Sequence, residues 1–86
     1  MAYLVQFTPA AAKALAGLDR GAQRRILAKV EGLASNPRPA GVKALQGEEG
    51  IYRLRVGDYR ILYAVRDREL VVLVVDVGHR REIYRR

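Results

Sequence analysis

A two-residue reversal in the second half constrains this 86-residue chain more than any other feature. Gly57-Asp58 separates two runs rich in β-branched and aromatic residues, Ile51 to Val56 and Tyr59 to Val65, as in a tight β-hairpin. A two-residue loop fixes the hairpin register, because each step away from the turn adds one cross-strand pair. The predicted pairs are Val56–Tyr59, Arg55–Arg60, Leu54–Ile61, Arg53–Leu62 and Tyr52–Tyr63.

The register sorts the hairpin by face, since side chains alternate along a strand. One face is apolar and aromatic and is the natural side for helices to cover: Tyr52, Leu54, Val56, Tyr59, Ile61 and Tyr63. The other face carries Arg53, Arg55 and Arg60. Two arginines directly opposite each other repel, whereas an unlike or apolar pair would stabilise the sheet by roughly 0.2–1 kcal/mol. We therefore expect carboxylates or a bound anion to neutralise this face.

The first half of the chain has the pattern of one strand and two helices. Tyr3 to Phe7 is a short β-rich run, and Thr8-Pro9 supplies an N-cap with proline at the first helical position. An alanine-rich helix extends to Leu18, and a second helix is expected from about Asp19 or Arg20 to Ala34, before two prolines. Four residues at helical spacing form its apolar stripe: Ala22, Ile26, Val30 and Leu33.

The third strand-like run, Leu70 to Val77, begins with six apolar residues, which suits a strand covered on both faces. A three-residue loop before it places Asp76 opposite Arg60, whereas a two-residue loop would turn this acid toward the helices. We expect the three-residue loop, residues 67–69, because it keeps the acid out of the core. The order β-α-α-β-β-β predicts an α+β fold: one domain over residues 1–86 with a small, mostly antiparallel sheet and a helix hairpin packed on one face.

Charge dominates the composition. Sixteen Lys and Arg against nine Asp and Glu give a net charge of +7, which favours nucleic acid, an anionic membrane or an acidic protein as partner. With no cysteine and one histidine, we expect no disulfide, no thiolate chemistry, no metal and no cofactor. No apolar run approaches the roughly 18 residues of a spanning helix. The N-terminal residues lack a basic signal-peptide region, so we expect a cytoplasmic protein.

The C-terminal segment adds to the basic charge. Residues 78–86 carry His79, Tyr84 and four arginines. Arginines on a sheet face with a nearby aromatic suit a phosphodiester and its unstacked bases, because guanidinium groups bind phosphate oxygens bidentately. A solvated basic surface is the alternative at this stage. Arg24 and Arg25 on the second helix are read as solvated surface, with a role in holding a partner as the other option.

Three stretches resemble the RelE/ParE toxin superfamily. They are Tyr-Arg-Leu-Arg-Val-Gly-Asp-Tyr-Arg-Ile-Leu-Tyr at 52–63, Val-Gly-His-Arg-Arg-Glu-Ile-Tyr at 77–84 and Lys-Ala-Leu-Gln-Gly at 43–47. The strand-helix-helix start agrees with them. RelE-type members imply a sequence-biased endoribonuclease that enters the ribosomal A site and cuts mRNA there. ParE-type members share the fold but inhibit DNA gyrase and lack the RNA-cutting residues. We favour the RelE-type branch.

The resemblance implies four catalytic positions. Arg60 and Arg80 match arginines that stabilise the phosphorane charge when the ribose 2′-hydroxyl attacks the adjacent phosphate. Tyr84 matches a tyrosine that orients the nucleotide or takes part in proton transfer. His79 is a further candidate acid or base, because histidine exchanges protons near neutral pH.

The resemblance also implies binding residues and partners. The RNA-binding positions are Lys43, Arg53, Arg55 and Arg81. The expected partners are the ribosome, mRNA and a small RelB-like antitoxin that wraps the helices and blocks the arginine face, with no membrane. Two alternatives stay open: a ParE-like, non-enzymatic inhibitor of DNA gyrase, and a catalytically weak RNA-binding relative.

Overall fold

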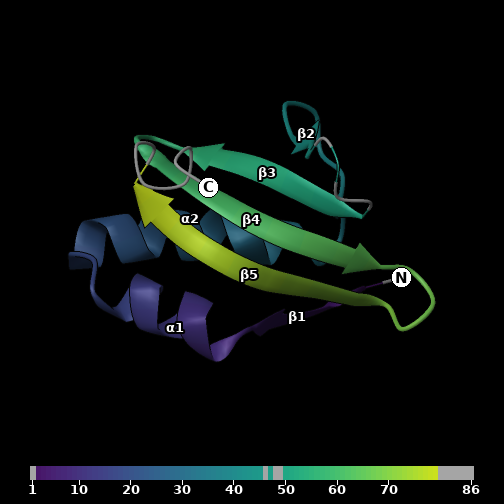
Figure 1. The fold of residues 1–86 in the computed structure, drawn as a ribbon, viewed down its shortest axis with the longest axis horizontal. Helices are drawn as coiled ribbons and strands as arrows, with labels where there is room; N and C mark the ends of the chain where they lie inside the picture. The colour runs from purple at the N-terminus through teal and green to yellow at the C-terminus, as the bar shows by residue number, and fades with distance from the viewer. Residues whose placement is uncertain (1, 46, 48–49, 80–86) are drawn as a thin grey trace.

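The structure is a computed structural model that describes residues 2–45, 47 and 50–79. Within these residues, five strands form one sheet in the order β1-β5-β4-β3-β2, and two helices lie against the same face of it (Figure 1). The elements are β1 (Leu4–Phe7), α1 (Pro9–Ala16), α2 (Arg20–Gly32), β2 (Lys43–Ala44), β3 (Ile51–Val56), β4 (Tyr59–Arg66) and β5 (Val71–His79). β1 is parallel to β5, and the other neighbours are antiparallel. The predicted α+β fold is confirmed.

The start of α1 is as predicted, whereas α2 ends early. The Thr8 hydroxyl accepts a hydrogen bond from the Ala11 N–H at 3.1 Å, and Pro9 is the first helical residue. α2 ends at Gly32 and not at the predicted Ala34. The amides of the next two residues bond to carbonyl oxygens three residues back, so the helix tightens into a turn before the prolines.

The core lies between the helices and one face of the sheet. The predicted stripe of α2 is at most 1% exposed: Ala22, Ile26, Val30 and Leu33. Four sheet residues in the same core are fully buried: Ile61, Tyr63, Val72 and Val74. Burying one large aliphatic side chain stabilises the fold by about 1.5–3 kcal/mol. These contacts fix the helices on this face of the sheet.

The hairpin of β3 and β4 has the predicted register. All five predicted pairs are present, including Arg55 with Arg60 beside the turn. Gly57 has a φ of 59°, in the left-handed region that glycine enters without steric cost and that tight hairpin turns require. The side chains of Arg53, Arg55 and Arg60 therefore share the face opposite the helices.

The connection between β4 and β5 is longer than predicted. Arg66 pairs with Val71, so residues 67–70 form the loop where three residues were expected. The Leu70 N–H bonds to the Asp67 carbonyl oxygen at 3.3 Å, and Leu70 has a φ of 55°. Leu70 therefore closes the turn, and the strand begins one residue later than predicted.

A bulge keeps Asp76 on the arginine face. A four-residue loop alone would turn this carboxylate toward the helices, but the register shifts by one residue between Leu62 and Tyr63. Asp76 pairs with Leu62, and Gly78 lies opposite Arg60. The prediction that Asp76 stands directly opposite Arg60 is wrong, because neither the longer loop nor the bulge was anticipated. The prediction that Asp76 stays out of the core is confirmed.

The edge strand β2 was not predicted. Lys43 pairs with Arg53 and Ala44 with Tyr52, in a segment that the sequence pattern assigned to a loop. Two residues are too few to produce a recognisable alternation, so this strand has no signal of its own in the sequence. Its consequence is to bring a lysine to the edge of the arginine face.

Neither helix in the described part of the chain is long and apolar enough to cross a membrane. Within residues 2–45, 47 and 50–79, no three His, Asp or Glu side chains gather closely enough to hold a metal ion. The most distinctive feature of the described surface is the position of its arginines.

Candidate nucleic-acid interface

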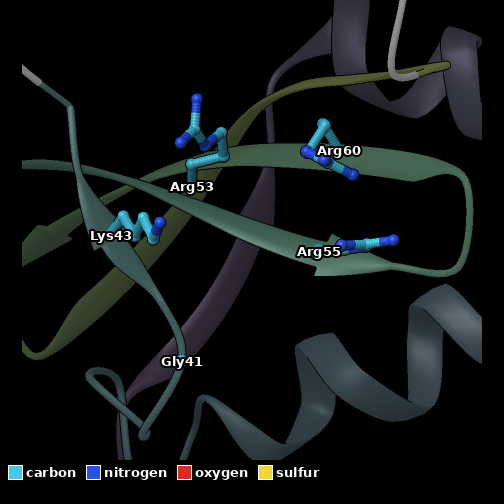
Figure 2. A pocket seen from close by; sticks show the side chains of 5 residues that line it. All are labelled: Gly41, Lys43, Arg53, Arg55 and Arg60. Carbon is cyan, nitrogen blue, oxygen red and sulfur yellow. The ribbon is translucent and has the colours of Figure 1, made fainter.

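Four cations surround a hollow on the sheet face opposite the helices (Figure 2). Arg53 and Arg55 come from β3, Arg60 from β4 and Lys43 from β2, and Gly41 completes the lining. The hollow has a volume of about 200 Å³. The structure thus brings together four of the residues that the sequence predicted for the site. We call this cluster, with Gly41, the arginine hollow.

The strand ladder explains why the cations meet. Lys43 is the cross-strand partner of Arg53, and Arg55 is the partner of Arg60. Both are like-charged pairs, which destabilise a sheet when nothing lies between them. An anion such as a phosphate would relieve the repulsion in both pairs. The arrangement of these two pairs therefore suits the binding of an anion.

Arg60 is the buried member of the cluster, with 6% of its surface exposed. Two apolar residues on the same face of β4 are also buried, Leu62 at 5% and Ala64 at 8%. A guanidinium in this less polar setting acts more strongly on a nearby negative charge than a fully solvated one does. Arg60 is therefore the side chain best placed to stabilise charge that develops on a bound phosphate.

Asp76 contributes one carboxylate to this face. It lies in the same row of the sheet as Arg53 and Leu62, diagonal to Arg60. The charged residues that the structure places around the hollow are four cations. That the whole face keeps a net positive charge stays a prediction.

His79 lies away from the arginine hollow. It pairs with Tyr59 at the end of β5, so its ring is on the side of the sheet that faces the helices. The two rings meet edge to face, with centroids 5.8 Å apart and an interplanar angle of 79°. The structure therefore does not bring His79 to Arg60. Three other predicted site residues fall outside the described residues: Arg80, Arg81 and Tyr84.

Gly41 is the residue of the hollow that sequence reasoning missed. Its φ is 95°, and a Cβ added there would meet nothing within 4 Å. The space above its backbone is therefore open to a ligand. The available signal was a glycine two residues before a basic residue, which gains meaning only once β2 is known to border the sheet.

At the other end of the sheet, a further arginine, Arg38, is held by the carboxylate of Asp67. Arg38 donates two hydrogen bonds to the Asp67 carboxylate, at 2.7 and 3.2 Å, and a third to the Tyr52 hydroxyl at 2.9 Å. The Tyr3 hydroxyl donates to the same carboxylate at 2.7 Å. Arg38 and then Tyr3 lower the pKa of Asp67, and the hydrogen bond to Asp67 raises the pKa of Tyr3. We call these four residues the Arg38 clamp.

The Arg38 clamp positions the segment that leads into the hollow. The Tyr63 hydroxyl donates to the Pro37 carbonyl oxygen at 2.8 Å, and the Tyr63 ring stacks on that of Tyr52 with centroids 5.7 Å apart. Burial raises the pKa of Tyr63 to about 12, so its hydroxyl remains a donor at physiological pH. Gly41 and Lys43 follow this anchored segment directly. The clamp therefore supports one wall of the arginine hollow.

Comparisons with known proteins agree with this architecture. The profile of the family described as the ParE toxin of the type II toxin-antitoxin system parDE matches residues 5–84. Toxin RelG of Mycobacterium tuberculosis is 35% identical over 91 aligned positions, which cover all of both chains. The RelE chain of the archaeal RelE–RelB complex from Pyrococcus horikoshii superposes with a TM-score of 0.82 at 32% identity, covering 93% of this chain and 97% of that one. The isolated Escherichia coli RelE toxin gives a TM-score of 0.83 at 30% identity, covering 98% and 93%.

The family profile and the structures together cover nearly the whole chain, including β1, both helices and the arginine-bearing hairpin. The named relatives are RelE-type toxins in bacteria and archaea. The chain belongs to the RelE/ParE superfamily of type II toxins, in its RelE-type branch.

Proposed function

We propose that this protein is the toxin of a toxin–antitoxin pair and acts as a ribosome-dependent endoribonuclease that cuts mRNA in the A site. The observation that carries the proposal is the arginine hollow: four cations, one of them the buried Arg60, around a space of about 200 Å³. A phosphodiester is the ligand that fits such a set, because guanidinium groups bind its oxygens bidentately and keep their charge.

The proposed reaction is an internal phosphoryl transfer. The ribose 2′-hydroxyl loses its proton and attacks the adjacent phosphorus, while the bond to the 5′-oxygen of the next nucleotide breaks and that oxygen takes up a proton. The products are a 2′,3′-cyclic phosphate and a 5′-hydroxyl. Arg60 would stabilise the charge on the equatorial oxygens of the phosphorane, and Arg53, Arg55 and Lys43 would hold the flanking backbone.

Proton transfer is a separate task in this scheme. Three of the four cations in the hollow are guanidiniums, which do not release a proton at physiological pH. The hollow therefore supplies charge stabilisation and positioning. We assign the remaining role to the C-terminal segment, where Arg80 would add to the stabilising charge and Tyr84 would orient the nucleotide or exchange a proton.

We further propose a small antitoxin as partner. The P. horikoshii relative was crystallised as a RelE–RelB complex. The present chain has a net charge of +7 and concentrates cations on one face, so an acidic antitoxin segment is complementary to it. Covering that face would block the mRNA as well as neutralise the charge.

Primer extension on translated messages tests the nuclease directly. After induction without antitoxin, we expect cuts in phase with codons in translated messages, and none in a matched message whose start codon has been removed. Arg60→Ala should remove the cuts, whereas Arg68→Ala, which deletes an exposed arginine in the β4–β5 loop, should retain them. Unchanged messages in cells that have stopped growing would reject the proposal.

The matching family profile supplies a reason to test a second function, since its description is that of a ParE toxin. Inhibition of DNA gyrase would halt growth without cutting mRNA. A supercoiling assay with purified gyrase separates the two, because an mRNA nuclease leaves supercoiling unchanged at every toxin concentration.

A further inference from the structure

A second, larger hollow adjoins the arginine hollow at the hairpin turn. It has a volume of about 620 Å³ and lies between α2 and the end of β3. Its lining residues are Arg25, Ala28, Lys29, Arg55, Val56 and Gly57. Arg55 lines both hollows, so they share one wall at the edge of the hairpin.

The new hollow combines cations with an apolar floor. Arg25, Ala28 and Lys29 are exposed and stand three and four positions apart, so they present one side of α2 to it. Val56 and Gly57 provide the floor, and a Cβ at Gly57 would meet nothing within 4 Å. A positively charged groove that follows the phosphate backbone is a common feature of sites for single-stranded nucleic acid, and Arg25, Lys29 and Arg55 provide one here.

We propose that this hollow binds the continuation of the RNA strand whose scissile phosphate occupies the arginine hollow. The inference rests on the proposed function and extends its footprint by the nucleotides next to the cut. Arg55 would contact the phosphate between the two hollows, and Arg25 and Lys29 would contact the following ones. An acidic helix is a poorer match, because it needs pockets for large apolar anchors and this floor offers only Ala28, Gly57 and the largely covered Val56.

Oligonucleotides of two lengths test the proposal. The probes are fluorescein-labelled 2′-O-methyl oligouridylates of about three and about ten nucleotides, which respectively fill one hollow or span both and cannot be cut. The variant is the double substitution Arg25→Ala and Lys29→Ala in the full chain. The control is Lys13→Ala with Arg20→Ala, which removes the same charge from exposed positions outside both hollows.

In fluorescence anisotropy, we expect the wild type to bind the long RNA more tightly than the short one. The double variant should lose about tenfold on the long RNA and little on the short one, and its salt-dependence slope should fall by about 1.4. The control should change both affinities alike and keep their ratio.

Three results would overturn the proposal. The first is equal affinity of the wild type for the two RNA lengths, and the second is an equal effect of the two double variants on RNA binding. The third is a double variant of Arg25 and Lys29 that binds RNA normally but no longer co-purifies with the antitoxin. That third result would assign the hollow to an acidic protein. Each of these results is independent of whether the protein cuts mRNA. The proposed cleavage is tested separately by Arg60→Ala, which leaves Arg25 and Lys29 unchanged.

Discussion

The two ends of the sheet treat arginine in opposite ways. Near the start of β3, Arg38 is held by the Asp67 carboxylate at 2.7 Å and lies over the Tyr52 ring, 5.4 Å from its centroid. Near the hairpin turn, Arg55 faces Arg60 across the ladder, in a hollow lined by further cations. Arg38 joins its own segment to the loop that carries Asp67. The second group gathers positive charge on one face of the sheet, where like-charged neighbours on a strand ladder repel each other.

The two ends of the sheet also make different contributions to the structure. Contacts of the Arg38 clamp, and the Tyr63–Pro37 bond beside it, join residues far apart in the sequence: Tyr3 to Asp67, Arg38 to Tyr52, and Tyr63 to Pro37. Such contacts order the segment before β2. The arginine hollow depends on that order for Lys43 and on the hairpin register for its arginines. Substitutions at the two ends should therefore have different readouts.

The largest effect is expected from a substitution in the arginine hollow. Arg60→Ala should lower mRNA cleavage by about 100-fold or more, because one preorganised donor to a developing oxyanion contributes that much. Arg38→Ala removes the same group from the other end and should change cleavage only a few fold. Cleavage on purified programmed ribosomes measures both, with circular dichroism to check folding. Equal losses would show that the two ends are not functionally distinct.

The next effect concerns stability at the opposite end. Tyr63→Phe deletes the buried hydroxyl that bonds to Pro37 and should lower the free energy of unfolding by about 1 kcal/mol. Tyr52→Phe should cost less, because its partner Arg38 is exposed to water and still held by Asp67. Urea unfolding measures both. A Tyr63→Phe protein as stable as the wild type would mean that the Pro37 contact does not anchor the segment.

The hairpin and the apolar stripe of the second helix could be predicted from local sequence. The Gly57-Asp58 turn predicted every pair of the hairpin, and hence the face that carries Arg53, Arg55 and Arg60. The stripe of α2 likewise follows from helical spacing alone. Both are set by neighbours within a few positions in the chain, where geometry leaves one solution.

What could not be predicted depends on distant contacts. Leu70 takes a left-handed conformation that its residue type does not suggest, and the bulge at Leu62 and Tyr63 compensates for the extra loop residue. The Arg38 clamp spans 64 positions between Tyr3 and Asp67 and has no sequence signal. His79 illustrates the effect on the site, since the same bulge helps determine that it pairs with Tyr59 on the helix side.

A smaller effect concerns how much the like-charged pair in the arginine hollow lowers the stability of the fold. Arg55→Glu replaces the like-charged pair with Arg60 by an opposite-charged one, and should raise the free energy of unfolding by roughly 0.2–1 kcal/mol while weakening RNA binding. Arg55→Gln, which removes repulsion without adding attraction, should fall between it and the wild type. Urea unfolding and RNA anisotropy on the same samples measure both effects. A loss of stability in Arg55→Glu would show that the hollow carries no electrostatic strain.

The smallest effect is a pH dependence at the Arg38 clamp. Hydrogen bonds from Arg38 and Tyr3 lower the pKa of Asp67 below its ordinary value of 3.8, so the folded state favours the ionised carboxylate. The resulting stabilisation is complete above that value and is lost as the pH falls through the folded pKa. The difference in melting temperature between the wild type and Asp67→Asn should therefore be constant between about pH 7 and pH 5 and vanish in stronger acid.

The magnitude of that difference should be small, because 42% of the Arg38 side chain and 56% of the Asp67 side chain are exposed, and it should shrink further in high salt. Glu69→Gln, which makes the same charge change in the same loop, is the matched control for the loss of one negative charge. At the alkaline end, the raised pKa of Tyr3 means that its bond to Asp67 persists up to the ordinary value of 10.0 and is lost as the phenol ionises above it. Tyr3→Phe should remove this alkaline step and also weaken the acid transition, because it deletes one of the two hydrogen bonds that lower the pKa of Asp67. A pH profile of Asp67→Asn parallel to that of the wild type would mean that the ion pair of Arg38 with Asp67 does not stabilise the fold.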